Sequence, residues 1–157
     1  MPVTIAEVEG PFGPLLVART DRGVAAIRAP AELPELLDAL RRRFPHDEPE
    51  WGPGEPLPGT GTSSEHEMPI DLRGLPDFDA RVYREVHAIP AGETLTYGEV
   101  AARIGSPGAA RAVGGAMARC PLFPLVPCHR VVRAADGWSG WGGDPAVKRR
   151  LLRAEAR

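Results

Sequence analysis

The sequence predicts an α/β protein of the α+β kind, in which a small sheet with one covering helix precedes a mainly helical region. Three observations support this: two short apolar runs around a turn signal, a stretch rich in proline and glycine, and later apolar residues at helical spacing. The chain has 157 residues, enough for one ordinary domain or two small ones. We expect an N-terminal α/β domain over residues 1–68 and a second domain over residues 69–157.

The first elements along the chain read as a β-hairpin and a helix. The runs GPLLVART (13–20) and GVAAIRA (23–29) flank the turn signal DRG, which predicts two antiparallel strands. The segment PAELPELLDALRRRF (30–44) follows, and its leucines fall on one helical face: Leu33, Leu36, Leu37 and Leu40. We expect this helix to cover the hairpin sheet.

Residues 45–68 change in character, because they contain five prolines and four glycines and show no apolar periodicity. Such a composition is typical of a linker or a long surface loop. We therefore place the boundary between the two domains in this stretch.

The second region begins with two helical patterns. DFDARVYREVHAI (77–89) places apolar side chains on one stripe, with Asp77 as the N-cap. Thr96 is expected to cap a short helix that continues to Ile104 and ends at Gly105. The stripe of the first helix consists of Phe78, Val82, Val86 and Ile89.

A further helix is predicted to start with Ser106 as N-cap and Pro107 at the first helical position. With the short helix before it, this makes a helix-turn-helix candidate, although many helix pairs have no role in DNA binding. Arg111 is the only long side chain on a face of small residues: Ala109, Ala110, Ala112, Gly114, Gly115 and Ala116. Each glycine costs a helix about 1 kcal/mol relative to alanine. Either tight packing against another helix or close approach to a nucleic-acid groove would account for this cost.

Charge is distributed unevenly along the chain. Residues 1–102 contain nine arginines and 18 acidic residues, whereas residues 103–157 contain nine arginines, one lysine and three acidic residues. A basic C-terminal third indicates a surface that binds a polyanion such as a nucleic acid. Alternatively, these basic residues are simply solvated, and the acidic residues of the first part balance their charge.

Neither membrane nor metal chemistry is indicated by the sequence. No run approaches the ~20 apolar residues needed to cross a bilayer, and the N-terminus MPVTIAEVEG lacks the pattern of a signal peptide. We expect a cytoplasmic protein. The two cysteines form no C-x-x-C pair, so no metal site or cofactor is expected.

Cys128 lies in LVPCHRVV, between a proline and a histidine. The prolines at 121, 124 and 127 exclude a regular helix, and the pattern predicts strand, turn, strand and loop. Pro127 keeps the preceding residue extended, so the chain must turn at Cys128 and His129. A cysteine beside a histidine is a candidate activated nucleophile, through a direct hydrogen bond or a bridging water. The alternative is a small apolar filler in the core.

The C-terminal segment DPAVKRRLLRAEAR predicts a helix with Asp144 as N-cap and Pro145 at its first position. Glu155 falls on the same stripe as Leu151 and Leu152. A carboxylate buried with these leucines needs a partner, which His129 or a backbone group could supply. Alternatively, Glu155 is exposed to solvent near the chain end.

Several of these motifs match one known family. VPCHRVV resembles the PCHR signature of the O6-alkylguanine-DNA alkyltransferases, also called methylated-DNA–protein-cysteine methyltransferases. The segments DLRGLPDFDARVYREVHAIPAGETLTYGEVAARIGSPGAARAVGGAM and GWGGDPAVKRRLLRAE are similar to that family's DNA-binding segment and its C-terminal loop and helix. The resemblance covers about residues 69–157. The N-terminal part is compatible with the family's variable first domain, which implies an RNase H-like arrangement.

The resemblance implies DNA repair by direct reversal. Such a protein flips an O6-alkylated guanine out of double-stranded DNA and transfers the alkyl group to a cysteine, here Cys128. His129 would act through water as the base and Glu155 would orient it. Tyr97 would donate a proton or hydrogen bond to the guanine leaving group and crowd the flanking phosphate. O4-alkylthymine is a further possible substrate.

The same resemblance assigns the remaining contacts. Arg111 would enter the base stack, and its helix would lie in the minor groove, where small side chains are required: Ala110, Ala112 and Gly114. The backbone carbonyl of Val131 would accept from the exocyclic amine of guanine. Trp141 and Gly142 would contribute to the pocket wall.

The chain departs from the family pattern at a few positions. Cys120 stands where the family usually has an asparagine that ties the recognition helix to the active-site strand, and we interpret it as a filler. Asp79 and Tyr83 replace the commoner glutamine and tryptophan, which we interpret as packing variation. No cysteines match the zinc ligands of some members' N-terminal domains.

These residues favour a single-turnover alkyltransferase that acts as a monomer, without a cofactor, on DNA in the cytoplasm. The chief alternative is an alkyltransferase-like protein that senses the lesion without chemistry, but such relatives typically lack the acceptor cysteine. A cysteine hydrolase is a third reading, and it lacks an evident oxyanion hole.

Overall fold

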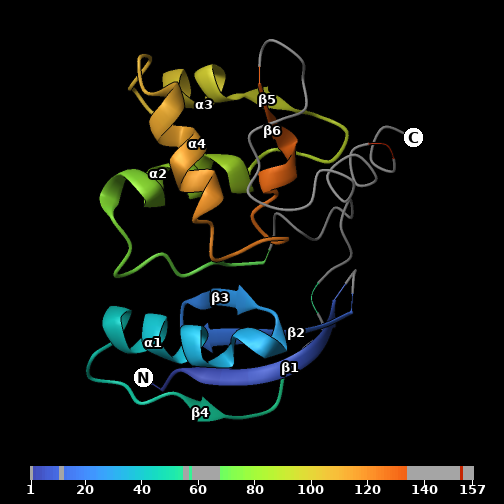
Figure 1. Ribbon diagram of the computed structural model, residues 1–157, viewed down its shortest axis with the longest axis vertical. Coiled ribbons are helices and arrows are strands. Elements are labelled where there is room, and N and C mark those ends of the chain that lie inside the picture. Colours follow the sequence, from blue (N-terminus) through green and yellow to red (C-terminus); the bar gives the residue numbers. More distant parts are fainter. Residues whose placement is uncertain (1, 11–12, 55–56, 58–67, 134–152, 154–157) are drawn as a thin grey trace.

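The computed structural model describes residues 2–10, 13–54, 57, 68–133 and 153. Figure 1 shows a sheet with helix α1 in one part of the molecule and three further helices, α2 to α4, in the other. The predicted mixture of an N-terminal sheet and a mainly helical second part is confirmed for these residues.

The N-terminal strands form an antiparallel meander of β1 (Thr4–Gly10), β2 (Gly13–Thr20) and β3 (Gly23–Arg28). The strand order is β3-β2-β1-β4, because a short fourth strand pairs in parallel with β1. The predicted hairpin of β2 and β3 is confirmed. Strand β1 was not predicted individually.

The short strand β4 (Glu50–Trp51) lies within the stretch that we predicted to have no regular structure, so that prediction is wrong at these two residues. The glycines just after it explain the pairing. A Cβ at Gly52 would collide with the side chain of Thr4, and one at Gly54 with Ala6. The glycines that resemble a linker in the sequence thus allow close approach to β1.

Helix α1 (Leu33–Arg43) follows a 3-10 turn and covers one face of the sheet, as predicted. Leu36 and Leu40 are fully buried there. Alternate strand residues point to the other face, where they join the core of the helical part. The core under α1 consists of Val3, Ile5, Leu16, Ala18, Ala25, Ala26, Leu36, Leu40 and Phe44. The sheet is therefore packed between α1 and the helical part.

Helices α2 (Asp77–His87) and α3 (Tyr97–Arg103) occur where the sequence predicts them. Asp77 is the first helical residue rather than the N-cap, since Pro76 occupies the cap position. Thr96 does cap α3: its side chain accepts from the Glu99 backbone N–H at 3.0 Å, and the Glu99 carboxylate accepts from the Thr96 N–H at 3.1 Å.

Helix α4 (Ala110–Ala118) starts later than predicted, because Ser106 belongs to the end of α3. Gly105 has a φ of 81°, and its N–H donates to the Ala102 carbonyl at 3.1 Å. The Ser106 N–H donates to the Ala101 carbonyl at 2.9 Å, which completes a C-terminal cap of the Schellman type. Ser106 and Pro107 therefore do not begin α4.

The outer edge of β3 is covered by two segments from the helical part. The Val24 N–H donates to the Pro69 carbonyl at 3.0 Å, and the Ile27 N–H donates to the Pro121 carbonyl at 2.7 Å. An uncovered edge strand would expose backbone groups that can pair with other chains. The edge thus joins the sheet to the segment that leads to Cys128.

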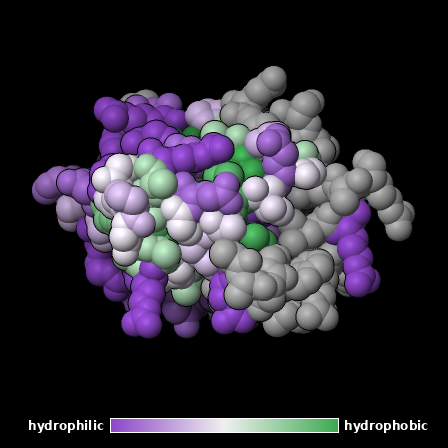
Figure 2. Space-filling model, turned by 90° about the horizontal axis from the view of Figure 1, so that it is seen from above, coloured by the Kyte–Doolittle hydropathy of each residue, from purple (hydrophilic) through white to green (hydrophobic). Residues whose placement is uncertain are grey.

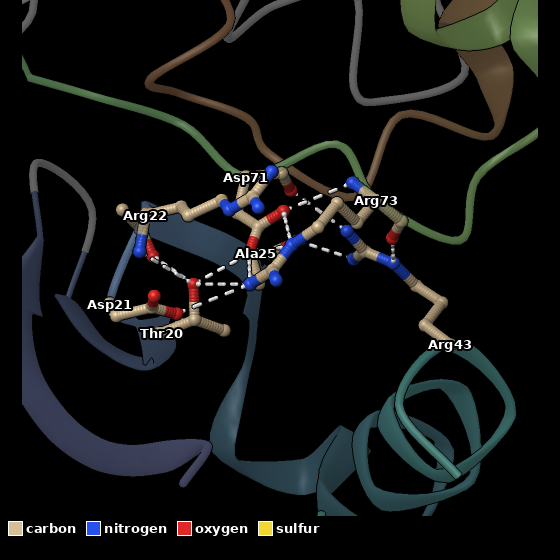
Figure 3. Close-up of polar contacts among 8 residues, drawn as sticks. Thr20, Asp21, Arg22, Ala25, Arg43, Asp71 and Arg73 are labelled. Atoms are coloured by element: carbon tan, nitrogen blue, oxygen red, sulfur yellow. Dashed lines mark hydrogen bonds and ion pairs between the residues drawn. The ribbon is translucent and has the colours of Figure 1, made fainter. Parts of the chain in front are cut away.

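A cluster of polar side chains reinforces this junction (Figure 3). Arg43, at the end of α1, donates to three carbonyls, those of Ala25 at 2.6 Å, Asp71 at 2.8 Å and Arg73 at 2.9 Å. The buried Asp71 carboxylate accepts from Arg73 at 2.6 Å and from the Thr20 hydroxyl at 2.5 Å. Burial alone would raise the pKa of Asp71, but these hydrogen bonds lower it to about 2.

Candidate functional site

Cys128 lies in a 3-10 turn formed by Cys128–Arg130, directly after Pro127. The predicted turn is confirmed, and the thiol is buried with 1% of the residue exposed. The strand predicted before it is wrong, because residues 121–126 form bends and turns, in which the Val126 N–H donates to the Leu122 carbonyl at 2.9 Å. The closely spaced prolines prevent regular pairing there.

A two-stranded parallel sheet joins the segment that contains Tyr97 to the segment that follows Cys128. Strand β5 (Leu95–Thr96) pairs with β6 (Val131–Val132), so Leu95 lies opposite Val131. Tyr97 follows β5 directly and begins α3, whereas Cys128 precedes β6 in the 3-10 turn. The register places Tyr97 level with Arg133, and Tyr97, Cys128 and Val131 belong to one buried core cluster.

Tyr97 is buried beside Cys128. Burial and, to a smaller extent, the nearby Cys128 raise the pKa of Tyr97 to about 12, whereas Arg133 acts in the opposite direction. Because the ordinary pKa of a tyrosine is about 10, the hydroxyl stays protonated at neutral pH and is available as a donor.

His129 and Arg130 are both fully buried. The His129 ring packs edge-on against Phe123, with ring centroids 6.0 Å apart. The Arg130 guanidinium donates to the Ile89 carbonyl at 2.8 Å. We assigned Arg130 no role from the sequence, although a charged residue between PCH and two valines is a signal of a buried polar contact.

Helix α4 presents two kinds of surface. Arg111 and Ala112 are exposed, Ala110 and Gly114 are partly exposed, and the opposite face is buried. Figure 2 looks onto this end of the molecule, where pale and green residues lie among purple, hydrophilic ones. The side chains buried beneath α4 are Val113, Ala116 and Met117.

The paired glycines of α4 have different surroundings. A Cβ at Gly114 would meet no atom of the described structure within 4 Å, whereas one at Gly115 would lie 3.0 Å from a guanidinium nitrogen of Arg119. Gly115 makes room for the exposed Arg119 side chain of the same helix end, and Gly114 keeps the outer surface of α4 flat. Neither glycine is thus in tight contact with another helix among the described residues, and Gly114 belongs to an open face.

Helix α2 contacts the end of α4 through polar groups. The Tyr83 hydroxyl donates to the Ala116 carbonyl at 2.7 Å. Arg119 donates to both oxygens of the Asp79 carboxylate, at 2.9 and 3.2 Å. Asp79 and Tyr83 are buried in the packing, as we interpreted them, and the structure adds the specific partners that buried polar groups require.

Cys120 follows α4 and is half-buried against the core, as expected for a filler. Its N–H donates to the Met117 carbonyl at 3.2 Å. Burial raises the pKa of Tyr83 far above its usual range, and Cys120, Asp79 and Cys128 contribute to this rise. Tyr83 thus lies near both cysteines.

Some predicted site residues lie outside the described residues: Trp141, Gly142 and Glu155, together with the predicted helix that begins at Asp144. In the described part of the chain, no group of three or more His, Cys, Asp or Glu residues is suited to a metal ion. None of the helices described is long and apolar enough to cross a membrane. Of the predicted set, the structure groups Cys128, His129, Val131 and Tyr97, and it places Arg111 on the exposed face of α4.

Comparison with known proteins identifies relatives of this arrangement. Residues 77–157 match the family described as 6-O-methylguanine DNA methyltransferase, DNA binding domain. A methylated-DNA–protein-cysteine methyltransferase of Mycobacterium bovis is 48% identical over 95 residues, which are 60% of this chain and 57% of that protein. The bifunctional transcriptional activator and DNA repair enzyme Ada of Escherichia coli is 32% identical over 92% of this chain and 43% of its own length. The chain thus spans about half the length of these curated relatives.

Among solved structures, a crystal structure of Mycobacterium tuberculosis OGT in complex with DNA superposes with a TM-score of 0.67. Its sequence is 34% identical, and the match covers 98% of this chain and 92% of that chain. The similarity therefore includes the N-terminal sheet as well as the helical part.

Proposed function

The chain belongs to the 6-O-methylguanine DNA methyltransferase family, and from this premise we propose that it repairs alkylated DNA by direct reversal. The substrate is an O6-alkylguanine in double-stranded DNA, with O4-alkylthymine as a possible second substrate. The alkyl group moves to the sulfur of Cys128 in a single turnover. The observation that carries the proposal is that the buried Tyr97 and the buried Cys128 belong to one core cluster, in which Cys128 contributes to the raised pKa of Tyr97.

The proposed reaction is a displacement at the alkyl carbon. A free thiol has a pKa near 8.5, so a base must remove its proton at neutral pH. His129 takes this proton through a water molecule, and Glu155 orients the imidazole. The thiolate forms the new S–C bond, the C–O6 bond breaks, and its electron pair goes to the guanine.

The Tyr97 hydroxyl then donates a hydrogen bond to the departing guanine anion, and the proton that His129 took from Cys128 is the one that neutralises this anion. The raised pKa of Tyr97 supports this role, because the hydroxyl keeps its proton near Cys128. The carbonyl of Val131 accepts from the exocyclic amine, and Trp141 and Gly142 contribute to the pocket. The thioether product is stable, so each molecule reacts once.

DNA is the proposed partner of a helix-turn-helix formed by α3 and α4, bound by a monomer through the minor groove. A duplex base is inaccessible to in-line attack until it is flipped, which costs a few kcal/mol. Arg111 replaces the flipped base in the stack. The small residues Ala110, Ala112 and Gly114 let α4 approach the groove closely. The exposure of Arg111 and the open space at Gly114 support this placement.

We also propose that the N-terminal part has an RNase H-like arrangement. The support is its topology, in which three antiparallel strands are followed by α1 and then by a strand parallel to β1.

The function is tested with duplex DNA that carries an O6-methylguanine with a labelled methyl group. We expect the label on Cys128 at no more than one group per protein. Cys128→Ser should abolish the transfer and keep DNA binding, whereas the control Cys120→Ser should retain the transfer. Binding without label in the wild type would favour a lesion sensor, and label on Cys120 would refute the acceptor assignment.

A further inference from the structure

Helix α2 carries three polar residues at four-residue intervals, Asp79, Tyr83 and His87. Residues four apart lie on the same face of a helix. Each of the three contacts the chain between α4 and Cys128, or the end of α4 itself. We call these three residues the α2 polar stripe.

Tyr83 contacts the last turn of α4. Its hydroxyl donates to the Ala116 carbonyl at 2.7 Å, and only 1% of the residue is exposed. The carbonyls of a helix's last turn lack partners four residues onward, and a side-chain donor can supply one. The Ala116 carbonyl otherwise accepts from the Arg119 N–H at 3.2 Å. The hydroxyl thus fixes the end of α4 relative to α2.

Asp79 holds the residue that caps α4. Its carboxylate lies in the first turn of α2 and accepts two hydrogen bonds from Arg119. The negative Asp79 lies near the N-terminus of α2 and the positive Arg119 near the C-terminus of α4, so each charge is favourable to the dipole of its helix. Asp79 is 5% exposed, so it would be a costly buried charge without Arg119.

His87 contacts the segment that leads to the cysteine. One ring nitrogen lies 3.1 Å from the Leu125 carbonyl oxygen, and the other lies 3.2 Å from that of Met68. Just beyond α2, the Ile89 carbonyl accepts from Arg130 at 2.8 Å. Helix α2 and its end therefore hold the chain on both sides of Cys128.

Local structure does not link α4 to the cysteine turn, because residues 119–127 contain no helix or strand. We propose that the α2 polar stripe sets the position of α4 relative to Cys128, so that a base flipped out by α4 arrives in line with the thiol. Its members are positioning residues, since they contact α4 and the cysteine segment rather than the reacting atoms. This inference rests on the proposed function and deepens it.

Two substrates separate positioning from a general effect on folding. Transfer from O6-methylguanine in duplex DNA requires α4 to be correctly placed relative to Cys128. Reaction with the free base O6-benzylguanine requires only the pocket around Cys128. A misplacement of about 1 Å can cost up to 100-fold in rate. We therefore expect Tyr83→Phe and Asp79→Asn each to slow the duplex reaction about tenfold and to change the free-base reaction less than about twofold.

Single-turnover titration counts only active molecules, so each ratio of duplex rate to free-base rate is independent of the folded fraction. The matched control is Glu85→Gln, which removes the 3.5 Å ion pair between α2 and Arg103 of α3 and should leave the ratio unchanged. Arg119→Gln combined with Asp79→Asn should lower the ratio no further than either change alone, because both remove the same contact.

Equal slowing of both reactions, or no slowing of either, would overturn the inference. Additive effects of Asp79→Asn and Arg119→Gln would also contradict it. A wild-type protein that neither substrate labels would overturn the proposed function and this inference with it.

Discussion

Two buried ionisable side chains are kept in different protonation states. Asp71, at the junction with the N-terminal sheet, is charged, whereas Tyr97, near the cysteine turn, is neutral. Burial disfavours the charged form of both and would raise both pKa values. The pKa of Asp71 is nevertheless lowered to about 2, because Arg73 and Thr20 donate to its carboxylate. The pKa of Tyr97 is raised to about 12, because its burial and the neighbouring Cys128 both favour the neutral hydroxyl.

The difference shows how the two regions divide their roles. At the junction, donors surround a charge, and the contacts stabilise the packing of segment 69–75 on the sheet (Figure 3). At the cysteine turn, a donor is kept protonated next to a nucleophile, which is suited to chemistry. Changes at the junction should therefore alter stability, and changes around Cys128 and α4 should alter the reaction.

The largest effect is expected for Tyr97→Phe, which should slow transfer from duplex DNA about 100-fold, since a positioned proton donor contributes at least this much. The ratio of wild-type to variant rate, measured from about pH 7 to pH 10, should stay constant because the pKa of Tyr97 is about 12. Taking the ratio cancels the titration of Cys128, which both proteins share. A ratio that halves near pH 10 would show an ordinary tyrosine pKa of about 10 and would weaken the contrast with Asp71.

A smaller effect is expected for Arg111→Ala, which should slow transfer from duplex DNA about tenfold. Without the arginine, nothing fills the gap that the flipped base leaves in the base stack. The free-base reaction should be unchanged, and so should the urea midpoint, because Arg111 is exposed. Arg84→Ala, an exposed arginine on α2, is the matched control. Equal slowing with both substrates would contradict a role in flipping.

At the junction, Asp71→Asn should lower the free energy of unfolding by about 1–2 kcal/mol near neutral pH. The pKa of Asp71 is lower in the folded protein than its usual 3.8. Its stabilisation is therefore complete above the unfolded-state pKa and is lost as the pH falls through about 2. The difference between variant and wild type should shrink accordingly in urea unfolding followed by circular dichroism.

The control for this variant is Asp21→Asn, which removes a more exposed partner of the same arginine, Arg73, at 3.3 Å. It should change stability little, since exposed ion pairs contribute at most about 1 kcal/mol. The transfer rate per active molecule should be unaffected by either change. A slower reaction in Asp71→Asn would break the proposed separation between junction and site.

The smallest effect is expected for Gly114→Ala, with stability and DNA affinity changing in opposite directions. Alanine favours a helix by up to about 1 kcal/mol over glycine, and a Cβ at Gly114 meets open space. The melting temperature should rise while affinity for duplex DNA falls, because the methyl group stands on the face that approaches the groove. Unchanged affinity would show that Gly114 does not face DNA.

The local elements were predictable from the sequence because neighbouring residues determine them. The leucines of α1, the capping box of Thr96 and Glu99, and the turn at Cys128 all act within a few residues. The family was predictable too, since its motifs are contiguous in the chain. Ser106 was misread because the same residue types occur at N-caps and in the turns that end helices.

Contacts between distant segments were decided only by the tertiary structure. Pairing of β1 with β4 and of β5 with β6 depends on register across many residues, and short strands carry little periodicity. The contact between Asp79 and Arg119 leaves no mark in the sequence, because polar side chains on a helix are usually solvated. Their meeting requires the end of α4 to reach α2, and no local pattern encodes that approach. The sequence thus determined the reactive groups, and the packing of α2 against α4 and the cysteine turn decided where they lie.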